Sequence, residues 1–160
     1  MGSETATNTA STVDLEALST LEFPIVEYEV SREKIGEYVA AIGDRNPVHS
    51  DVAAAQRLGY RDLVAPPTFA AVFATRPFRV ALADPDWVSR ATFDPKRILH
   101  GGQSYSFHRP VFPGDRLIVQ SIVEDVYTKK NLVFLVVATR VDADGAERVL
   151  DATTTLIIRL

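Results

Sequence analysis

Residues 42–51 read IGDRNPVHSD and place a carboxylate, Asp44, five positions before an imidazole, His49. Asn46 and Pro47 lie between them, and this pair favours a turn. The segment therefore predicts a tight connection between two helices, which can direct the two side chains at one point.

A carboxylate and a histidine held close together can share one water molecule. The carboxylate accepts a hydrogen bond or a proton from the water, and a histidine whose pKa is near neutral can take or give the other proton. The alternative interpretation is structural, with Asp44 capping a helix and His49 satisfied by local hydrogen bonds, and such capping is common. The residues around Asp44 and His49 help to decide between the catalytic and the structural interpretation.

Helical patterns flank the turn on both sides. Before it, apolar residues recur at helical spacing from Ser31, a favourable N-cap, to Gly43, a favourable helix end. After it, the alanine-rich residues 51–58 predict a short helix that stops at Gly59. Residues 23–30 come first and predict a short strand or an extended lead-in.

A third helical segment, TFAAVFAT at residues 68–75, is apolar on nearly every side, which is typical of a buried helix. Pro67 suits the start of this helix, and Pro77 is expected to end or kink it. The pattern of residues 78–96 is irregular, and we expect this segment to run over the surface with Trp87 packed over a loop.

From Ile98 onward the hydrophobic pattern changes to a period of two. Asp144-Gly145 is a strong hairpin turn within this half. Helices followed by a meander of strands indicate an α+β fold. The segments that predict strands are residues 98–108, 116–127, 132–141 and 148–160.

The composition fits one globular domain. The chain has 160 residues, of which 46% are hydrophobic and 24% charged, and no apolar run approaches the length that spans a bilayer. A formal net charge of −4 argues against a nucleic-acid surface. Cysteine is absent, which excludes a thiolate metal site, and three histidines argue against a histidine-rich one.

The first residues have the composition of a tail. Residues 2–14 are rich in Ser, Thr, Ala and Asn and lack the hydrophobic centre of a secretion signal. We therefore expect a disordered tail over residues 1–20, a folded domain over residues 21–160, and a cytoplasmic protein.

The run from Tyr38 to Ala55, with the pattern Gly-Asp-x-Asn-Pro-x-His-x-Asp, resembles the signature of the MaoC-like (R)-specific enoyl-CoA hydratases and (3R)-hydroxyacyl-thioester dehydratases. LHGGQ at 99–103, HRP at 108–110 and PGD at 113–115 resemble further runs of the actinobacterial dehydratases in this family. The resemblance implies a hot-dog fold, in which a long central helix is wrapped by an antiparallel sheet of about five strands.

The resemblance also implies a reaction. Asp44 and His49 would activate water for the reversible hydration of a trans-2-enoyl thioester of CoA or acyl carrier protein, a hydro-lyase activity without a metal or cofactor. Negative charge on the thioester oxygen then needs a hydrogen-bond donor. Many relatives use the N–H of a glycine that opens the central helix. Pro67 stands there in this chain and has no N–H, so the N–H of Thr68 is the expected donor.

Other motif residues are expected to have supporting roles. His100 and His108 are interpreted as structural, because strand histidines in turn-rich regions usually satisfy local polar groups. The residues expected to support the turn or to contact the substrate are Gly43, Asn46, Tyr60, Pro67 and Phe69.

A single hot-dog unit leaves a sheet edge and a helix face uncovered, and the family covers them by pairing two units. We therefore expect a homodimer, or a heterodimer with a second hot-dog subunit. Two other functions stay open. A non-catalytic acyl-binding subunit would bind acyl-CoA without turnover, and a hot-dog acyl-CoA thioesterase would need a carboxylate aimed at the thioester carbonyl.

Overall fold

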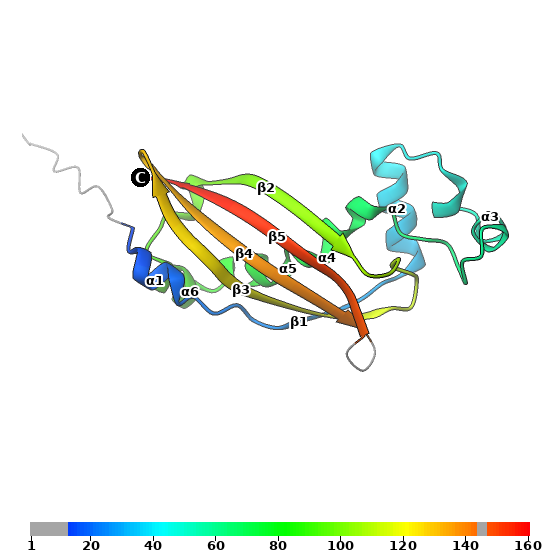
Figure 1. The fold of residues 1–160 in the computed structure, drawn as a ribbon, viewed down its shortest axis with the longest axis horizontal. Coiled ribbons are helices and arrows are strands. Elements are labelled where there is room, and N and C mark those ends of the chain that lie inside the picture. Colours follow the sequence, from blue (N-terminus) through cyan, green and yellow to red (C-terminus); the bar gives the residue numbers. More distant parts are fainter. Residues whose placement is uncertain (1–12, 144–146) are drawn as a thin grey trace, which may run out of the picture.

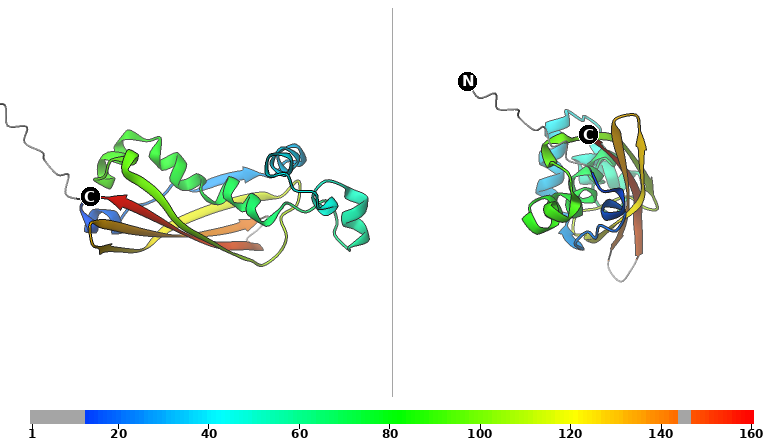
Figure 2. Two further views of the ribbon diagram at one scale, coloured as in Figure 1. Left: turned by 90° about the horizontal axis from the view of Figure 1, so that it is seen from above. Right: turned by 90° about the vertical axis from the view of Figure 1, so that its left-hand side faces the viewer.

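The computed structural model describes residues 13–143 and 147–160. A curved, antiparallel, five-stranded sheet has the strand order β1-β3-β4-β5-β2 (Figure 1). Helices cover one face of the sheet, with α4 and α5 along it and α2 and α3 beyond one end (Figure 2). This arrangement confirms the predicted α+β fold with five strands.

The strands agree with the predicted segments to within a few residues. Burial alternates along β4, where Val133, Leu135 and Val137 face the helices and are buried. Asp144-Gly145, the predicted hairpin turn, lies outside the described residues. The strands are β1 (Val26–Glu29), β2 (Ile98–Phe107), β3 (Arg116–Lys129), β4 (Leu132–Ala143) and β5 (Glu147–Arg159).

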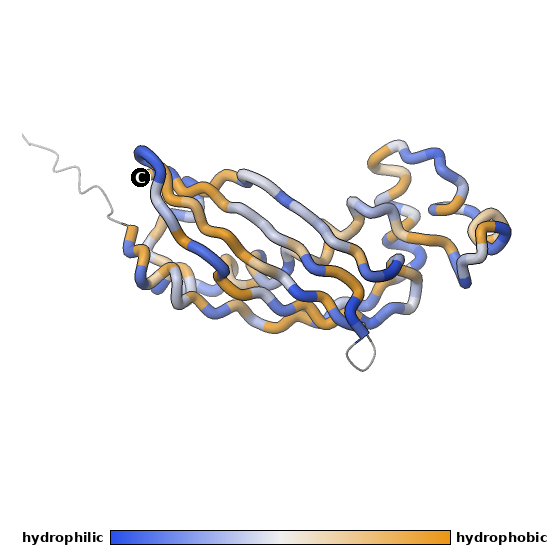
Figure 3. Tube along the Cα trace, in the orientation of Figure 1, coloured by the Kyte–Doolittle hydropathy of each residue, from blue (hydrophilic) through white to orange (hydrophobic). Residues whose placement is uncertain are grey.

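The two helices that flank the motif have the predicted boundaries. The Ser31 hydroxyl accepts a hydrogen bond from the backbone of Lys34 and caps α2 (Arg32–Ile42), which ends at Gly43 in the left-handed conformation. The helix α3 (Val52–Arg57) follows the turn. In Figure 3 the chain between α2 and α3 is largely hydrophilic, whereas the strands carry hydrophobic stretches.

The prediction of a disordered tail over residues 1–20 is wrong for its last part. Residues Leu15–Ser19 form helix α1, capped by the Asp14 carboxylate, which accepts hydrogen bonds from the N–H groups of Glu16 and Ala17. Leu18 is completely buried in a cluster with Trp87. The helix is held by a cap and an apolar contact that the polar composition of the segment conceals.

The predicted long central helix is divided. A 3-10 turn, η2 (Pro67–Phe69), leads into α4 (Ala70–Ala74), and α5 (Arg76–Leu82) follows after a break at Thr75. Pro77 lacks the N–H that would continue the helical hydrogen bonds, so the prediction that it ends or kinks the helix is confirmed as a break, at Thr75.

The segment at residues 78–96 is mostly helical, which corrects the expectation of irregular structure. It contains the end of α5, helix α6 (Pro85–Ala91) and η3 (Pro95–Arg97). Pro85 and Pro95 are each the first residue of a helix, and the aspartate before each proline caps that helix, so these prolines begin helices and do not interrupt them. Trp87 is packed as expected, and its indole N–H donates to the carbonyl of Glu22 at 2.7 Å.

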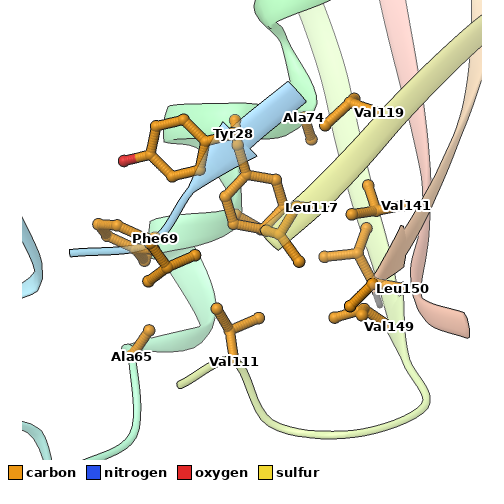
Figure 4. Close-up of a cluster of buried hydrophobic side chains, with 14 of the residues drawn as sticks. Tyr28, Ala65, Phe69, Ala74, Val111, Leu117, Val119, Val141, Val149 and Leu150 are labelled. Atoms are coloured by element: carbon orange, nitrogen blue, oxygen red, sulfur yellow. The ribbon is translucent and has the colours of Figure 1, made fainter. Parts of the chain in front are cut away.

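The main core lies between α4 and the sheet, beside the turn that carries the motif. Phe69 and Tyr28 converge there with Leu117 and Val141 from the strands (Figure 4). Over residues 13–143 and 147–160, no helix combines the length and apolar character needed to cross a bilayer.

Candidate active site

The turn between α2 and α3 is closed by its own polar side chains. It contains the 3-10 helix η1 (Pro47–His49). Asp44 Oδ1 accepts a hydrogen bond from the N–H of Asn46 at 2.9 Å, and Asn46 Oδ1 accepts one from the N–H of Val48 at 3.2 Å. Asn46 therefore supports the turn, and Oδ2 of Asp44 takes no part in these hydrogen bonds.

His49 is buried, with 8% of its surface exposed, and its ring orientation is set by the backbone. Its Nδ1 lies 2.6 Å from the carbonyl oxygen of Val64. A carbonyl oxygen only accepts hydrogen bonds, so Nδ1 carries a proton, and Nε2 is the nitrogen that has a free lone pair whenever the ring is neutral.

The two side chains of the motif face each other across a short gap. Nε2 of His49 lies 3.7 Å from Oδ2 of Asp44, and 27% of the Asp44 side chain is exposed. This separation is too long for a direct hydrogen bond but allows both atoms to contact one water molecule. The structure therefore brings the carboxylate and the imidazole of the sequence motif together at one point, as predicted.

Segment 60–65 forms the wall behind His49. The N–H of Val64 donates to the carbonyl of Val48 at 3.0 Å, and the N–H of Ala65 donates to the carbonyl of Val111 at 2.9 Å. Val64 thus binds the turn twice, through its N–H and its carbonyl. Local sequence patterns carry no signal for this contact, because it joins segments that are 15 residues apart.

A cavity of about 650 Å³ opens in front of His49. Its volume is in the usual range for small-molecule sites, about 300–1,000 Å³. Asp44 and Thr68 are not part of the cavity wall, and Phe69 is completely buried in the core. The lining residues are Asn46, Val48, His49, Tyr60, Val64, Ala65, Pro67, Phe107, His108, Arg109, Pro110 and Val111.

The start of the central helix offers one backbone donor. The N–H groups of Phe69 and Ala70 bond to Pro66 and to residues of η2. Pro67 has no N–H, and the N–H of Thr68 has no hydrogen-bond partner within the described residues. A backbone N–H without a partner at the start of a helix can bind an oxygen of a ligand.

Sequence reasoning did not place the end of β2 in the cavity wall. His108 is half-exposed there, and its Nε2 lies 2.8 Å from Asp151, so the interpretation of a locally paired histidine agrees with the structure. His100 lies 3.2 Å from Gln103 in the same strand. The hydrogen bond with His108 and the Arg148 guanidinium lower the pKa of Asp151.

A curved sheet around a central helix, with a carboxylate and imidazole beside a cavity, defines a hot-dog domain of the MaoC-like dehydratase and hydratase class. Residues 17–152 match the model of the FAS1-like, dehydratase domain region. The chain belongs to this family. It is also 38% identical over 136 residues to a UPF0336 protein of Saccharopolyspora erythraea, and these residues make up 85% of each of the two chains.

Solved structures have the same fold. A 3R-hydroxyacyl-ACP dehydratase complex, HadBC of Mycobacterium tuberculosis, has a chain that is 27% identical with a TM-score of 0.71, covering 86% of this chain and 96% of that one. The R-hydratase PhaJ1 of Pseudomonas aeruginosa is 25% identical with a TM-score of 0.61, covering 86% of this chain and 81% of that one.

Proposed function

We propose that the protein catalyses the reversible hydration of trans-2-enoyl thioesters to (3R)-hydroxyacyl thioesters. The observation that carries this proposal is the position of the His49 ring, whose Nε2 lies 3.7 Å from Oδ2 of Asp44 beside the cavity while its Nδ1 faces the carbonyl of Val64. Membership of a dehydratase family supports the reaction class.

In the hydration direction, Asp44 holds the water by accepting one hydrogen bond, and His49 Nε2 accepts a proton from it. The hydroxyl oxygen adds to C3 and negative charge moves to the thioester oxygen. The N–H of Thr68 stabilises this charge at the start of the central helix. The proton on His49 then moves to C2, which completes the addition of water. Dehydration follows the same steps in reverse.

An apolar cavity supports an acyl substrate. It has a volume of about 210 Å³ and lies between the central helix and the sheet. Its hydroxyl groups are turned into the protein: Thr75 bonds to Ala71, Ser121 to Thr139 and Thr154 to Gln103. The walls therefore present carbon, which suits the hydrocarbon tail of a CoA or acyl-carrier-protein thioester.

Pairing with a second hot-dog unit is part of the proposal. The strand β2 lies at an edge of the sheet, and Thr68 and Ala71 are exposed on the central helix. A homodimer would cover both surfaces. The similar HadBC and ChsH1-ChsH2 structures are complexes of two different subunits. They favour a second candidate function, in which this chain binds acyl groups as the partner of another subunit.

The test is loss of the enoyl-thioester absorbance of trans-2-enoyl-CoA with the purified protein. Asp44→Asn and His49→Ala should each reduce kcat by about 100-fold or more, in line with the loss of a general acid–base group. Activity of the native protein that both variants retain would contradict the mechanism. A native protein that binds acyl-CoA of every chain length without turnover would favour the partner-subunit function.

A further inference from the structure

Asp115 is a buried carboxylate behind the cavity wall, with 1% of its surface exposed. Its Oδ2 accepts hydrogen bonds from Arg109 at 2.7 Å and from the N–H of Phe112 at 2.9 Å, both within its own loop. Its Oδ1 accepts a third, at 2.6 Å, from Arg61, which is 54 residues away. The charged hydrogen bond to Arg61 therefore joins the loop to another part of the chain.

Arg61 belongs to the segment that orients the proposed catalytic histidine. Three residues after it is Val64, whose carbonyl accepts the Nδ1–H of His49. The next residue, Ala65, is bound to the loop by its N–H, which donates to the carbonyl of Val111. The segment is therefore attached to the Asp115 loop on both sides of the Val64 carbonyl.

We propose that Asp115 is a positioning residue for His49, and that it acts through Arg61 and the carbonyl of Val64. Without the ion pair, the segment keeps the backbone hydrogen bonds of Val64 and Ala65 and loses its charged attachment to the Asp115 loop on the side before Val64. The carbonyl then moves away from Nδ1, and the imidazole exchanges its proton between the two nitrogens. An Nε2 that carries the proton cannot take another from water, so the active fraction of the enzyme falls.

Two variants test the connection from its two ends. Asp115→Asn removes the charge from the buried side. Arg61→Met removes the positive charge of the pair, on its exposed side. In the native protein 62% of the Arg61 side chain is exposed, and its guanidinium lies 4.6 Å from the ring centre of Phe112. Methionine keeps an apolar stem over this ring. The second variant does not disturb the core, so it remains informative if Asp115→Asn folds poorly.

The control is another buried aspartate with the same type of partners. Asp142, with 8% of its surface exposed, accepts from Arg140 at 2.5 Å and from Arg148 at 3.1 Å. None of these three residues lines the cavity in front of His49. Asp142→Asn therefore removes a comparable ion pair without touching the segment that holds the histidine.

The direct measurement is the tautomer of His49, from nitrogen NMR of protein labelled with ¹⁵N-histidine. The chain has three histidines, and His100→Gln and His108→Gln identify the remaining signals. The native protein should show a protonated Nδ1 and an unprotonated Nε2 for His49. Asp115→Asn and Arg61→Met should show a mixture, whereas Asp142→Asn should keep the native tautomer.

The kinetic measurement rests on the proposed function. Both variants should lower kcat by about 10- to 100-fold with a KM within about twofold of native, because misplacement by about 1 Å can cost as much as 10²-fold. A protein that shows the tautomer change without hydratase activity would support the positioning role and overturn the proposed function. A native tautomer in both variants, or the same change in Asp142→Asn, would overturn the positioning role.

Discussion

Filling the apolar cavity between the central helix and the sheet should change the preferred length of the acyl chain. Val137 lies on the inner face of β4 and forms part of the wall of this cavity. Val137→Phe places a ring in the space where the proposal puts the acyl tail. The four atoms of the shortest enoyl group would react at the Asp44–His49 pair and would not reach the added ring.

The cavity volume sets the magnitude of the effect. A volume of about 210 Å³ holds about seven groups of the size of a methylene, at roughly 30 Å³ each, the volume of a liquid water molecule. Each methylene that enters contributes about 0.8 kcal/mol, which is about fourfold in kcat/KM. A ring that excludes three methylenes should therefore lower kcat/KM by about 60-fold for long chains.

The assay compares kcat/KM over a series from trans-2-butenoyl-CoA to trans-2-dodecenoyl-CoA. The matched control is Val136→Phe, which makes the same change on the adjacent residue of β4, where the side chain points to the other face of the sheet. The control should leave the dependence on chain length unchanged.

Two results would refute the reasoning about the cavity. If Val137→Phe lowers kcat/KM equally for all chain lengths, the ring disturbs the fold and the cavity does not select the tail. If the long-chain substrates keep their native kcat/KM in a folded variant, the tail binds elsewhere.

Three further predictions concern stability. Leu18→Ala should lower the free energy of unfolding by about 2–5 kcal/mol in urea denaturation, because the side chain is completely buried; an unchanged midpoint would show that α1 is not docked. Trp87→Phe removes the hydrogen bond to Glu22 and should cost about 1 kcal/mol, measured in the same way, and a neutral result would contradict the role of this bond. The hydrogen bond with His108 lowers the pKa of Asp151. The ionised carboxylate therefore stabilises the native state above the ordinary carboxyl pKa, and this stability is lost as the pH falls through the lower native pKa. Between about pH 6 and pH 3, the urea midpoint of Asp151→Asn should therefore fall less steeply than that of the native protein.

The local parts of the site could be predicted from the sequence because they are made by neighbouring residues. Asn46 bonds within the turn, and Gly43 ends α2 in the left-handed conformation that glycine adopts readily. The closeness of Asp44 and His49 follows from this turn. Their roles in catalysis stay a prediction that the hydration assay addresses.

The remaining parts depend on contacts that local patterns do not contain. The carbonyl of Val64 was not identified as the partner of His49, since a backbone group has no signature in the side-chain sequence. The helix α1 was missed because its stability comes from Leu18 in a distant cluster. The prolines at 85 and 95 were interpreted as irregular structure, whereas the aspartates before them make capped helix starts.

The two ring nitrogens of His49 face different parts of the chain. The presence of the sequence motif is therefore a separate matter from the correct tautomer of its histidine. The turn of residues 44–51 closes through its own hydrogen bonds, whereas Nδ1 of His49 is bound by the carbonyl of Val64 in another segment. A relative could therefore keep every letter of the signature, change residues 61–65, and hold the imidazole in the wrong protonation state. Under the proposed mechanism, a reactive member would be marked by the signature together with residues 61–65, which orient the imidazole.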